Sequence, residues 1–267
     1  MWELLILLAV IVGIHWWEYS SSVQEYTFAH PATLDRHDEL STVLKEKTPI
    51  AVEIGSLPWR PTVAATAAWT VTVDSNGATI DMPASQWINE VTINEVTINE
   101  VVKNEVTTKP PITNGEALAA EMELTNGLAD IDAGRPWWWL PGLRSAHVYI
   151  LEPGQLIGLS WVGSERHWIG CSHVESEPLT LWLVHSRYRR YLPSGDSINP
   201  WTLTVAEAPW IGRVQYSEVT IKPGWCMGLP AHWGFAARAS DAGAAWIWTA
   251  DQHSAFSLGL EKLQRAV

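Results

Sequence analysis

The sequence has few cysteines, few charged residues and no glycosylation sequon. Among its 267 residues only Cys171 and Cys226 are cysteines, and they do not form a Cys-x-x-Cys pair. Two cysteines cannot build a disulfide framework, so we expect both to be buried thiols. Charged residues make up 17% of the chain, below the roughly 25% that is usual for soluble proteins. Asn-x-Ser/Thr is absent, so nothing in the sequence points to glycosylation.

The chain also lacks the motifs of several large enzyme classes. It has no phosphate-binding glycine loop, no Gly-x-Ser-x-Gly, no His-Glu-x-x-His and no zinc-finger spacing. Its formal net charge is −12, whereas a surface that binds nucleic acid needs clustered basic residues. We therefore do not expect nucleic acid as a partner.

Tryptophan is the residue in excess, with 18 copies in a chain that is 47% hydrophobic. This length and composition allow one large domain or two small ones, with a sizeable core. Tryptophan buries a large area and offers one N–H donor, so we interpret most copies as core residues. The alternative is a carbohydrate-binding module, in which exposed tryptophan rings stack on sugars.

An unbroken apolar run extends from Leu4 to Ile14 and is followed by Trp16, Trp17 and Tyr19. Aromatic residues at the end of an apolar helix suit the headgroup region of a bilayer. The run is short, because a helix from Leu4 to Trp17 spans about 21 Å against a hydrocarbon core of about 30 Å.

Three interpretations of this N-terminal segment compete. A cleaved signal peptide would have a basic n-region, but Met-Trp-Glu has no lysine or arginine. A buried core helix fits poorly with uniform apolarity at the N-terminus. We predict a single-pass membrane anchor at residues 1–19, of undetermined orientation, followed by a linker at residues 20–34.

The rest of the chain, residues 35–267, is expected to form one mainly β domain. An amphipathic helix is predicted at 35–47, strands at 50–54 and 69–73, and a second helix at 116–128. From His147 onward, short apolar runs alternate with turn signals at the spacing of a sandwich or barrel. Residues 86–110 hold a five-residue repeat that suits neither a helix nor a strand, so we interpret them as an inserted loop or irregular ribbon.

One sequence motif occurs twice in this domain. Glu152-Pro-Gly-Gln-Leu-Ile-Gly-Leu159 recurs as Lys222-Pro-Gly-Trp-Cys-Met-Gly-Leu229, each after strand-like residues. Pro-Gly forms a type II turn in which glycine supplies the positive φ. We therefore predict two hairpins at equivalent places in a barrel.

The second copy continues as Pro230-Ala-His-Trp-Gly-Phe235, and this motif resembles the second conserved motif of cupin-like, JmjC-related domains. The entry at residues 47–69 resembles those domains too, as do His173-Val-Glu175 and the basic segment 186–190. The resemblance spans roughly residues 35–250. It implies a cupin-like jelly-roll barrel with a helical entry.

In such enzymes a His-x-Asp/Glu pair and a distal histidine bind Fe(II), and the open positions take 2-oxoglutarate and oxygen. The resemblance makes His173 and Glu175 the first two metal ligands, and Arg189 or Arg190 the partner of the co-substrate carboxylate. The third ligand position holds Phe235, which cannot bind metal. His232 is the alternative donor, although three residues along a strand would place it on the opposite face.

Two functions follow from this incomplete motif. The preferred one is a membrane-anchored cupin-like module that is not catalytic and that binds a protein partner or small ligand, or has a structural role. The alternative is an Fe(II)- and 2-oxoglutarate-dependent oxygenase, a hydroxylase. Along a strand at 185–191, His185, Arg187, Arg189 and Tyr191 would share one face.

Overall fold

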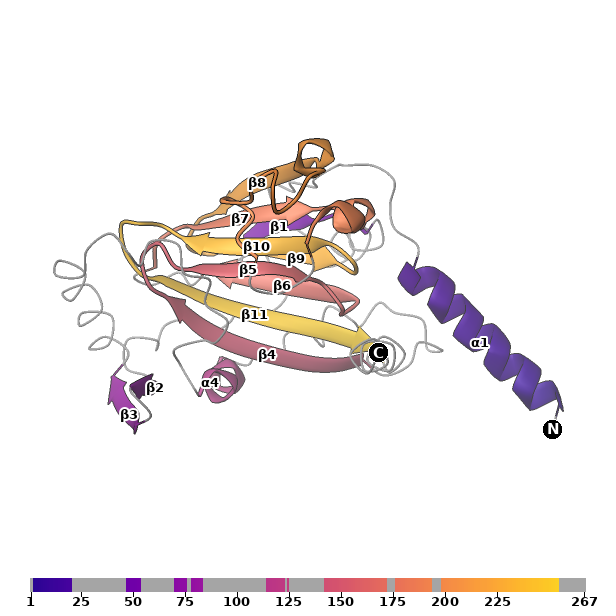
Figure 1. Ribbon diagram of the computed structural model, residues 1–267. Helices are drawn as coiled ribbons and strands as arrows, with labels where there is room; N and C mark the ends of the chain where they lie inside the picture. The colour runs from indigo at the N-terminus through magenta and orange to yellow at the C-terminus, as the bar shows by residue number, and fades with distance from the viewer. Residues whose placement is uncertain are drawn as a thin grey trace.

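The computed structural model describes residues 2–20, 47–53, 70–75, 78–83, 114–122, 124, 142–171, 176–193 and 198–254. In these residues the predicted mainly β class is confirmed, with antiparallel sheets and few helices (Figure 1). Of the entry helix predicted at 35–47, residues 35–46 lie outside the described residues, and so does the five-residue repeat at 86–110.

Two sheets make up the domain. The large sheet has the strand order β1-β9-β6-β11-β4, and the small sheet has the order β5-β10-β7-β8. The strands of the large sheet are β1 (Ile50–Glu53), β4 (Gly142–Leu151), β6 (Arg166–Cys171), β9 (Trp225–Pro230) and β11 (Ala245–Ser254). Those of the small sheet are β5 (Leu156–Trp161), β7 (Leu179–Val184), β8 (Tyr216–Ile221) and β10 (Gly234–Ala239). A separate hairpin joins β2 (Thr70–Ser75) to β3 (Ala78–Pro83).

The last eight strands pair in a nested order. β4 pairs with β11, β5 with β10, β6 with β9, and β7 with β8, all antiparallel. The chain from β4 to β11 is thus a long ribbon whose two halves run side by side. The two sheets stack as separate layers (Figure 1), and they do not join into a closed barrel within the described residues.

The two Pro-Gly motifs form the predicted tight turns, but the prediction that these turns close hairpins is wrong. Gly154 and Gly224 have φ of 73° and 83°, and the following N–H in each case bonds back to Glu152 or Lys222. The first turn leads from β4 in the large sheet to β5 in the small sheet, and the second leads from β8 to β9 in the reverse direction. Each turn is therefore an arch between layers, which the local sequence cannot distinguish from a hairpin.

The core lies between the two sheets, and side-chain alternation along each strand defines it. In β6, residues 167, 169 and 171 face inward. Their paired residues 251, 249 and 247 of β11 face the same way. Inward residues of β7 and β10 in the small sheet pack against this face. The other face of the large sheet is buried as well, with Val148, Ile150 and Trp248 at most 2% exposed, and α4 (Gly115–Glu121) packs against β4, the edge strand of this sheet (Figure 1). The first half of the helix predicted at 116–128 is therefore present as α4, and most of its second half lies outside the described residues.

Tryptophan fills both faces, as the sequence composition suggested. The most buried tryptophan side chains are those of Trp168, Trp182, Trp233, Trp246 and Trp248, which are at most 4% exposed. On the outer face of the large sheet, the ring of Trp248 lies over Gly170 and that of Trp168 lies over Gly228. Only glycine leaves room for a ring directly on the backbone of the neighbouring strand.

The basic segment predicted as a strand is a 3-10 helix, η3 (Ser186–Tyr191). The imidazole of His185 caps it by accepting a hydrogen bond from the N–H of Arg187 at 3.1 Å. A 3-10 helix has three residues per turn, so Tyr188 and Tyr191 lie on one side. Both pack on the outer face of the small sheet, and this aromatic packing overrides the strand pattern.

The N-terminal helix α1 (Trp2–Ser20) is formed as predicted and stands apart from both sheets (Figure 1). Except for Ile11, its large apolar side chains whose burial is described are 43–80% exposed. Among the described residues, no helix combines the length and the apolar content needed to cross a membrane.

The packing of Trp248 on Gly170 gives a test of the fold. A Cβ at residue 170 would overlap the indole ring of Trp248, which is fully buried. We expect Gly170→Ala to lower the free energy of unfolding by about 2–3 kcal/mol, measured by urea denaturation. Gly212→Ala is the matched control, because a Cβ there meets nothing within 4 Å. Equal stability of the two variants would contradict the described packing.

Candidate functional site

Polar residues gather at one end of the core, between the large sheet and β10. His167 is the second residue of β6, and Asp251 lies directly opposite it on β11. Ser164 comes from the turn that connects β5 to β6. These three side chains converge within an otherwise apolar core, so they form the candidate site.

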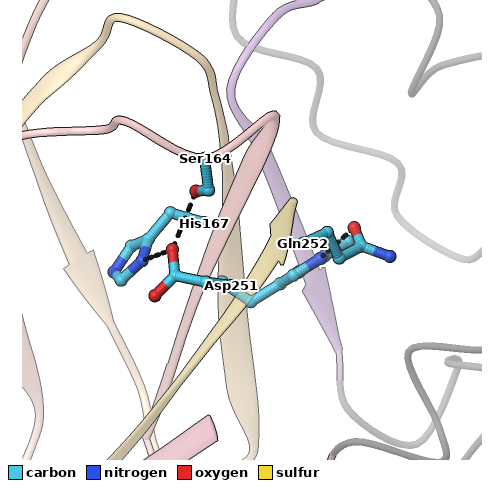
Figure 2. Close-up of polar contacts among 5 residues, drawn as sticks. Ser164, His167, Asp251 and Gln252 are labelled. Atoms are coloured by element: carbon cyan, nitrogen blue, oxygen red, sulfur yellow. Dashed lines mark hydrogen bonds and ion pairs between the residues drawn. The ribbon is translucent and has the colours of Figure 1, made fainter. Parts of the chain in front are cut away.

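The carboxylate of Asp251 holds the three residues together. Its Oδ1 atom lies 2.9 Å from Nδ1 of His167 and accepts a hydrogen bond from the Ser164 hydroxyl at 2.7 Å. Figure 2 shows both side chains directed at this carboxylate, while the next residue, Gln252, points to the other side of the sheet. There Gln252 accepts a hydrogen bond from the Trp168 indole at 3.2 Å. The alternation of β11 therefore assigns Asp251 to the core and Gln252 to the outer face.

The Asp251 carboxyl is held in its ionised form. Burial raises its pKa, but His167 and the Ser164 hydroxyl, with a smaller effect of His253, outweigh burial and bring the pKa below the ordinary value. An ionised carboxylate only accepts hydrogen bonds, so Nδ1 of His167 must carry the proton that it donates.

The second nitrogen of His167 is available for an interaction. His167 is only 8% exposed, and its Nε2 atom is buried without a hydrogen-bond partner among the described residues. The side chain of Asp251 is 30% exposed, so this end of the core is open to solvent on the β11 side. An oriented imidazole with one free nitrogen can accept a proton or contact a ligand.

Phe235, which occupies the third ligand position in the resemblance, lies against this pair. Its ring stacks on the His167 ring at 4.7 Å between centroids, with an angle of 26° between planes. Phe235 is the second residue of β10 and is 7% exposed. The phenyl ring thus fills the space beside the histidine with carbon.

The predicted ligands His173 and Glu175 lie outside the described residues. The strand that precedes them, β6, ends at Cys171. Along β6, Cys171 is four residues from His167, which is about 13 Å in a strand. The histidine beside Phe235 is therefore His167, at the opposite end of that strand.

The alternative donor His232 lies in the turn between β9 and β10, with a positive φ of 69°. Its backbone N–H donates to the carbonyl of Val162 at 2.8 Å and ties this turn to the one after β5. Asp251 and His167 do not bond to His232, so it is not part of the polar pair.

The predicted carboxylate partners Arg189 and Arg190 are exposed on η3. The Arg189 guanidinium lies over the Trp161 ring at 5.3 Å, and that of Arg190 lies over the Tyr191 ring at 4.7 Å. Arg190 also donates to the Tyr191 hydroxyl at 2.7 Å. Both arginines are thus held by aromatic residues at the surface, and the structure does not bring them to Asp251 and His167.

A second set of polar side chains lies next to Asp251, on β11 and β4. Burial raises the pKa of Tyr149, while a hydrogen bond with Thr249 works in the opposite direction. His147 lies 4.8 Å from the Tyr149 ring, and burial lowers its pKa although Glu116 of α4 favours the charged form. The large sheet thus carries a polar row on its inward face, from β6 across β11 to β4.

Both cysteines are buried thiols, as predicted, and neither belongs to this site. Burial raises the pKa of Cys171 to about 11, and the pKa of the fully buried Cys226 is raised further. Cys171 interacts with the Ser176 hydroxyl at 3.1 Å and with the Glu177 carbonyl at 3.2 Å. Thiols held in the protonated form are poor nucleophiles and poor metal ligands.

The described residues do not fit the Fe(II) that the resemblance implies. No group of three His, Cys, Asp or Glu side chains in the described part of the chain is arranged to hold a metal ion. Phe235 contributes no donor atom, and Oδ1 of Asp251 is engaged by Ser164 and His167. We therefore derive no reaction step through iron.

Comparison with known proteins gives no further assignment. No protein-family model matches the chain, and no curated protein matches it.

The Asp251 carboxylate predicts a pH-dependent stability. We expect Asp251→Ala to lower the free energy of unfolding by about 2–4 kcal/mol, because it leaves buried donors of His167 and Ser164 unpaired. Since the folded pKa of Asp251 is lowered, its charge stabilises the fold above the ordinary value of 3.8, and this stabilisation is lost as the pH falls through the folded pKa.

The stability difference between the native protein and Asp251→Asn should therefore be constant above about pH 5 and shrink in acid. Urea titrations at several pH values measure it. Glu218→Gln, at an exposed position of β8, is the control and should show no such difference. A difference for Asp251→Asn that grows in acid would contradict the assigned ionisation.

Proposed function

We propose that this chain is a membrane-attached, cupin-like jelly-roll module that is not catalytic and that binds a partner or small ligand, or has a structural role. The observation that carries the proposal is the pairing of Phe235 with His167 in the core. A motif position that would donate to a metal instead carries a phenyl ring stacked on the neighbouring histidine.

The jelly-roll assignment is supported by the nested strand pairing. Eight strands that pair first with last, second with seventh, third with sixth and fourth with fifth follow the double Greek key of jelly rolls, to which cupins belong. The two Pro-Gly arches stand at related places in this ribbon and run in opposite directions between the layers. The related places of the two turns explain why the same Pro-Gly motif occurs twice.

The membrane attachment is supported by the surface of α1. The successive residues Leu4 to Leu8 are each at least 57% exposed, and consecutive residues point around all sides of a helix. A helix that is apolar on all sides is stable in lipid or in a protein core, rather than on a protein surface. The exposed rings of Trp2, Trp16 and Trp17 suit the boundary between lipid and water.

Metal analysis tests the non-catalytic assignment. We expect the full chain, purified in detergent and supplied with Fe(II), to retain no stoichiometric iron and to show no iron-dependent decarboxylation of 2-oxoglutarate. His173→Ala and His232→Ala should behave as the native protein does. Stoichiometric iron that is lost in either variant, together with decarboxylation, would support the oxygenase instead.

Vesicle flotation tests the attachment. We expect the full chain to float with phosphatidylcholine vesicles, and the double variant Leu5→Lys with Leu8→Lys to remain in the dense fraction. Each lysine in the apolar stretch costs about 3 kcal/mol of insertion free energy. The control carries the same added charge at exposed positions of the domain, as Thr220→Lys with Ala242→Lys, and should still float. Equal flotation of both double variants would refute a role of α1 in lipid binding.

A further inference from the structure

A cluster of arginines and aromatic rings lies at one end of the small sheet. We call it the basic–aromatic surface, and it consists of η3, η4 (Ile211–Arg213) and the side chains of Trp161 and Trp210. η3 follows β7 and η4 precedes β8, and these strands pair so that Val184 lies opposite Tyr216. The Tyr188 hydroxyl joins the two segments by donating to Gln215 at 2.9 Å. η3 and the segment after η4 are therefore in direct contact.

The positive charge of this region contrasts with the rest of the chain. Residues 186–215 contain four arginines and two acidic residues, whereas the whole chain has a formal net charge of −12. Arg189, Arg190 and Arg213 are exposed, and within the described part of the chain they form no ion pair. The one described acidic residue of the segment, Glu207, instead accepts hydrogen bonds from Thr204.

Each of these arginines is held over an aromatic ring. The Arg213 guanidinium lies 4.5 Å from the centre of the Trp210 ring, and Arg189 and Arg190 lie over Trp161 and Tyr191. Stacking on a ring face holds a guanidinium group at the surface without using its N–H donors, although one donor of Arg190 bonds to the Tyr191 hydroxyl. The loop before η4 also exposes apolar side chains, with Trp210 at 50% and Val205 at 68%.

We propose that the basic–aromatic surface contacts the anionic headgroups of a membrane and orients the domain on it. This inference rests on the proposed function, which places the chain at a bilayer through α1. Guanidinium groups bind lipid phosphates and carboxylates, while tryptophan and an aliphatic side chain enter the headgroup boundary. An exposed valine in the same loop as the tryptophan favours lipid over single-stranded nucleic acid, which uses aromatic rings and basic residues alone.

The charge distribution adds a reason for a fixed orientation. An anionic membrane repels a domain that is acidic overall, and it attracts the region where arginines outnumber carboxylates. The domain tethered by α1 should therefore turn the ends of β7 and β8 toward the bilayer. The two Pro-Gly turns, at the opposite end of the small sheet, would then face away from it.

A competition between two vesicle populations tests this proposal with the full chain. Phosphatidylcholine vesicles are mixed with dense, sucrose-loaded vesicles that also contain phosphatidylserine, and the chain is quantified in the pellet and supernatant. We expect a preference for the phosphatidylserine vesicles of roughly tenfold or more, which falls as salt is raised.

Arginine-to-glutamine variants then show which residues contact the membrane. Each arginine near an anionic surface contributes about fivefold in partitioning, so Arg213→Gln should lower the preference by about fivefold. Arg189→Gln, Arg190→Gln and Arg213→Gln together should abolish it. Lys222→Gln removes one exposed charge at the opposite end of β8 and should leave the preference unchanged. Far-ultraviolet circular dichroism and the Tm of each variant verify folding.

Three outcomes would overturn the proposal. They are an equal distribution of the native chain between the two populations, an equal loss in Lys222→Gln and Arg213→Gln, and tight binding of a poly(U) oligonucleotide without any preference for phosphatidylserine. Failure of α1 as an anchor is seen separately, as absence of the native chain from phosphatidylcholine vesicles alone. The arginine-dependent preference can still be measured in that case.

Discussion

The register of β6 against β11 is the constraint on which the rest of the structure depends. It places His167 opposite Asp251 and Trp168 opposite Ala250. A slip by one residue would turn the histidine out of the core and the indole of Trp168 into it, and it would remove the glycine beneath Trp248. Burial of tryptophan on the outer face of the large sheet and pairing of Asp251 on its inner face therefore select the same register.

Burial of the Asp251–His167 pair costs free energy, and the surrounding groups offset this cost. A buried carboxylate without partners would be strongly unfavourable, but Asp251 accepts two hydrogen bonds and its side chain keeps partial contact with solvent. Phe235 packs on the histidine that completes this arrangement. Ser164 and His167 thus satisfy Oδ1 of the Asp251 carboxylate, and our proposal of a binding or structural module starts from this arrangement.

Much of the strand content could be predicted from the sequence, because apolar alternation and Pro-Gly signals are local. The strands after Ile50 and Trp69 and the two tight turns followed from such patterns. The arches could not be predicted, because the choice between a hairpin and a layer crossing depends on distant strands. Tyr188 and Tyr191 override the strand pattern of η3 through tertiary packing.

The polar pair could not be predicted either, since 84 residues separate its members and neither stands in a motif. The sequence pointed to His173 and Glu175 through a short local pattern, whereas packing of the large sheet on the small sheet brings His167 to Phe235. One available signal was Asp251, a charged residue that directly follows the largely apolar first part of β11, residues 245–250. A lone charge in such a strand needs a buried partner or an exit to solvent.

The most direct test of this account is nitrogen-15 NMR of the His167 imidazole in the full chain. We expect a proton on Nδ1 that is protected from exchange, that disappears in Asp251→Ala, and that is unaffected by added Fe(II). An Nδ1 atom without a proton, or a shift of Nε2 to values typical of a metal ligand when Fe(II) or another divalent ion is added, would contradict it.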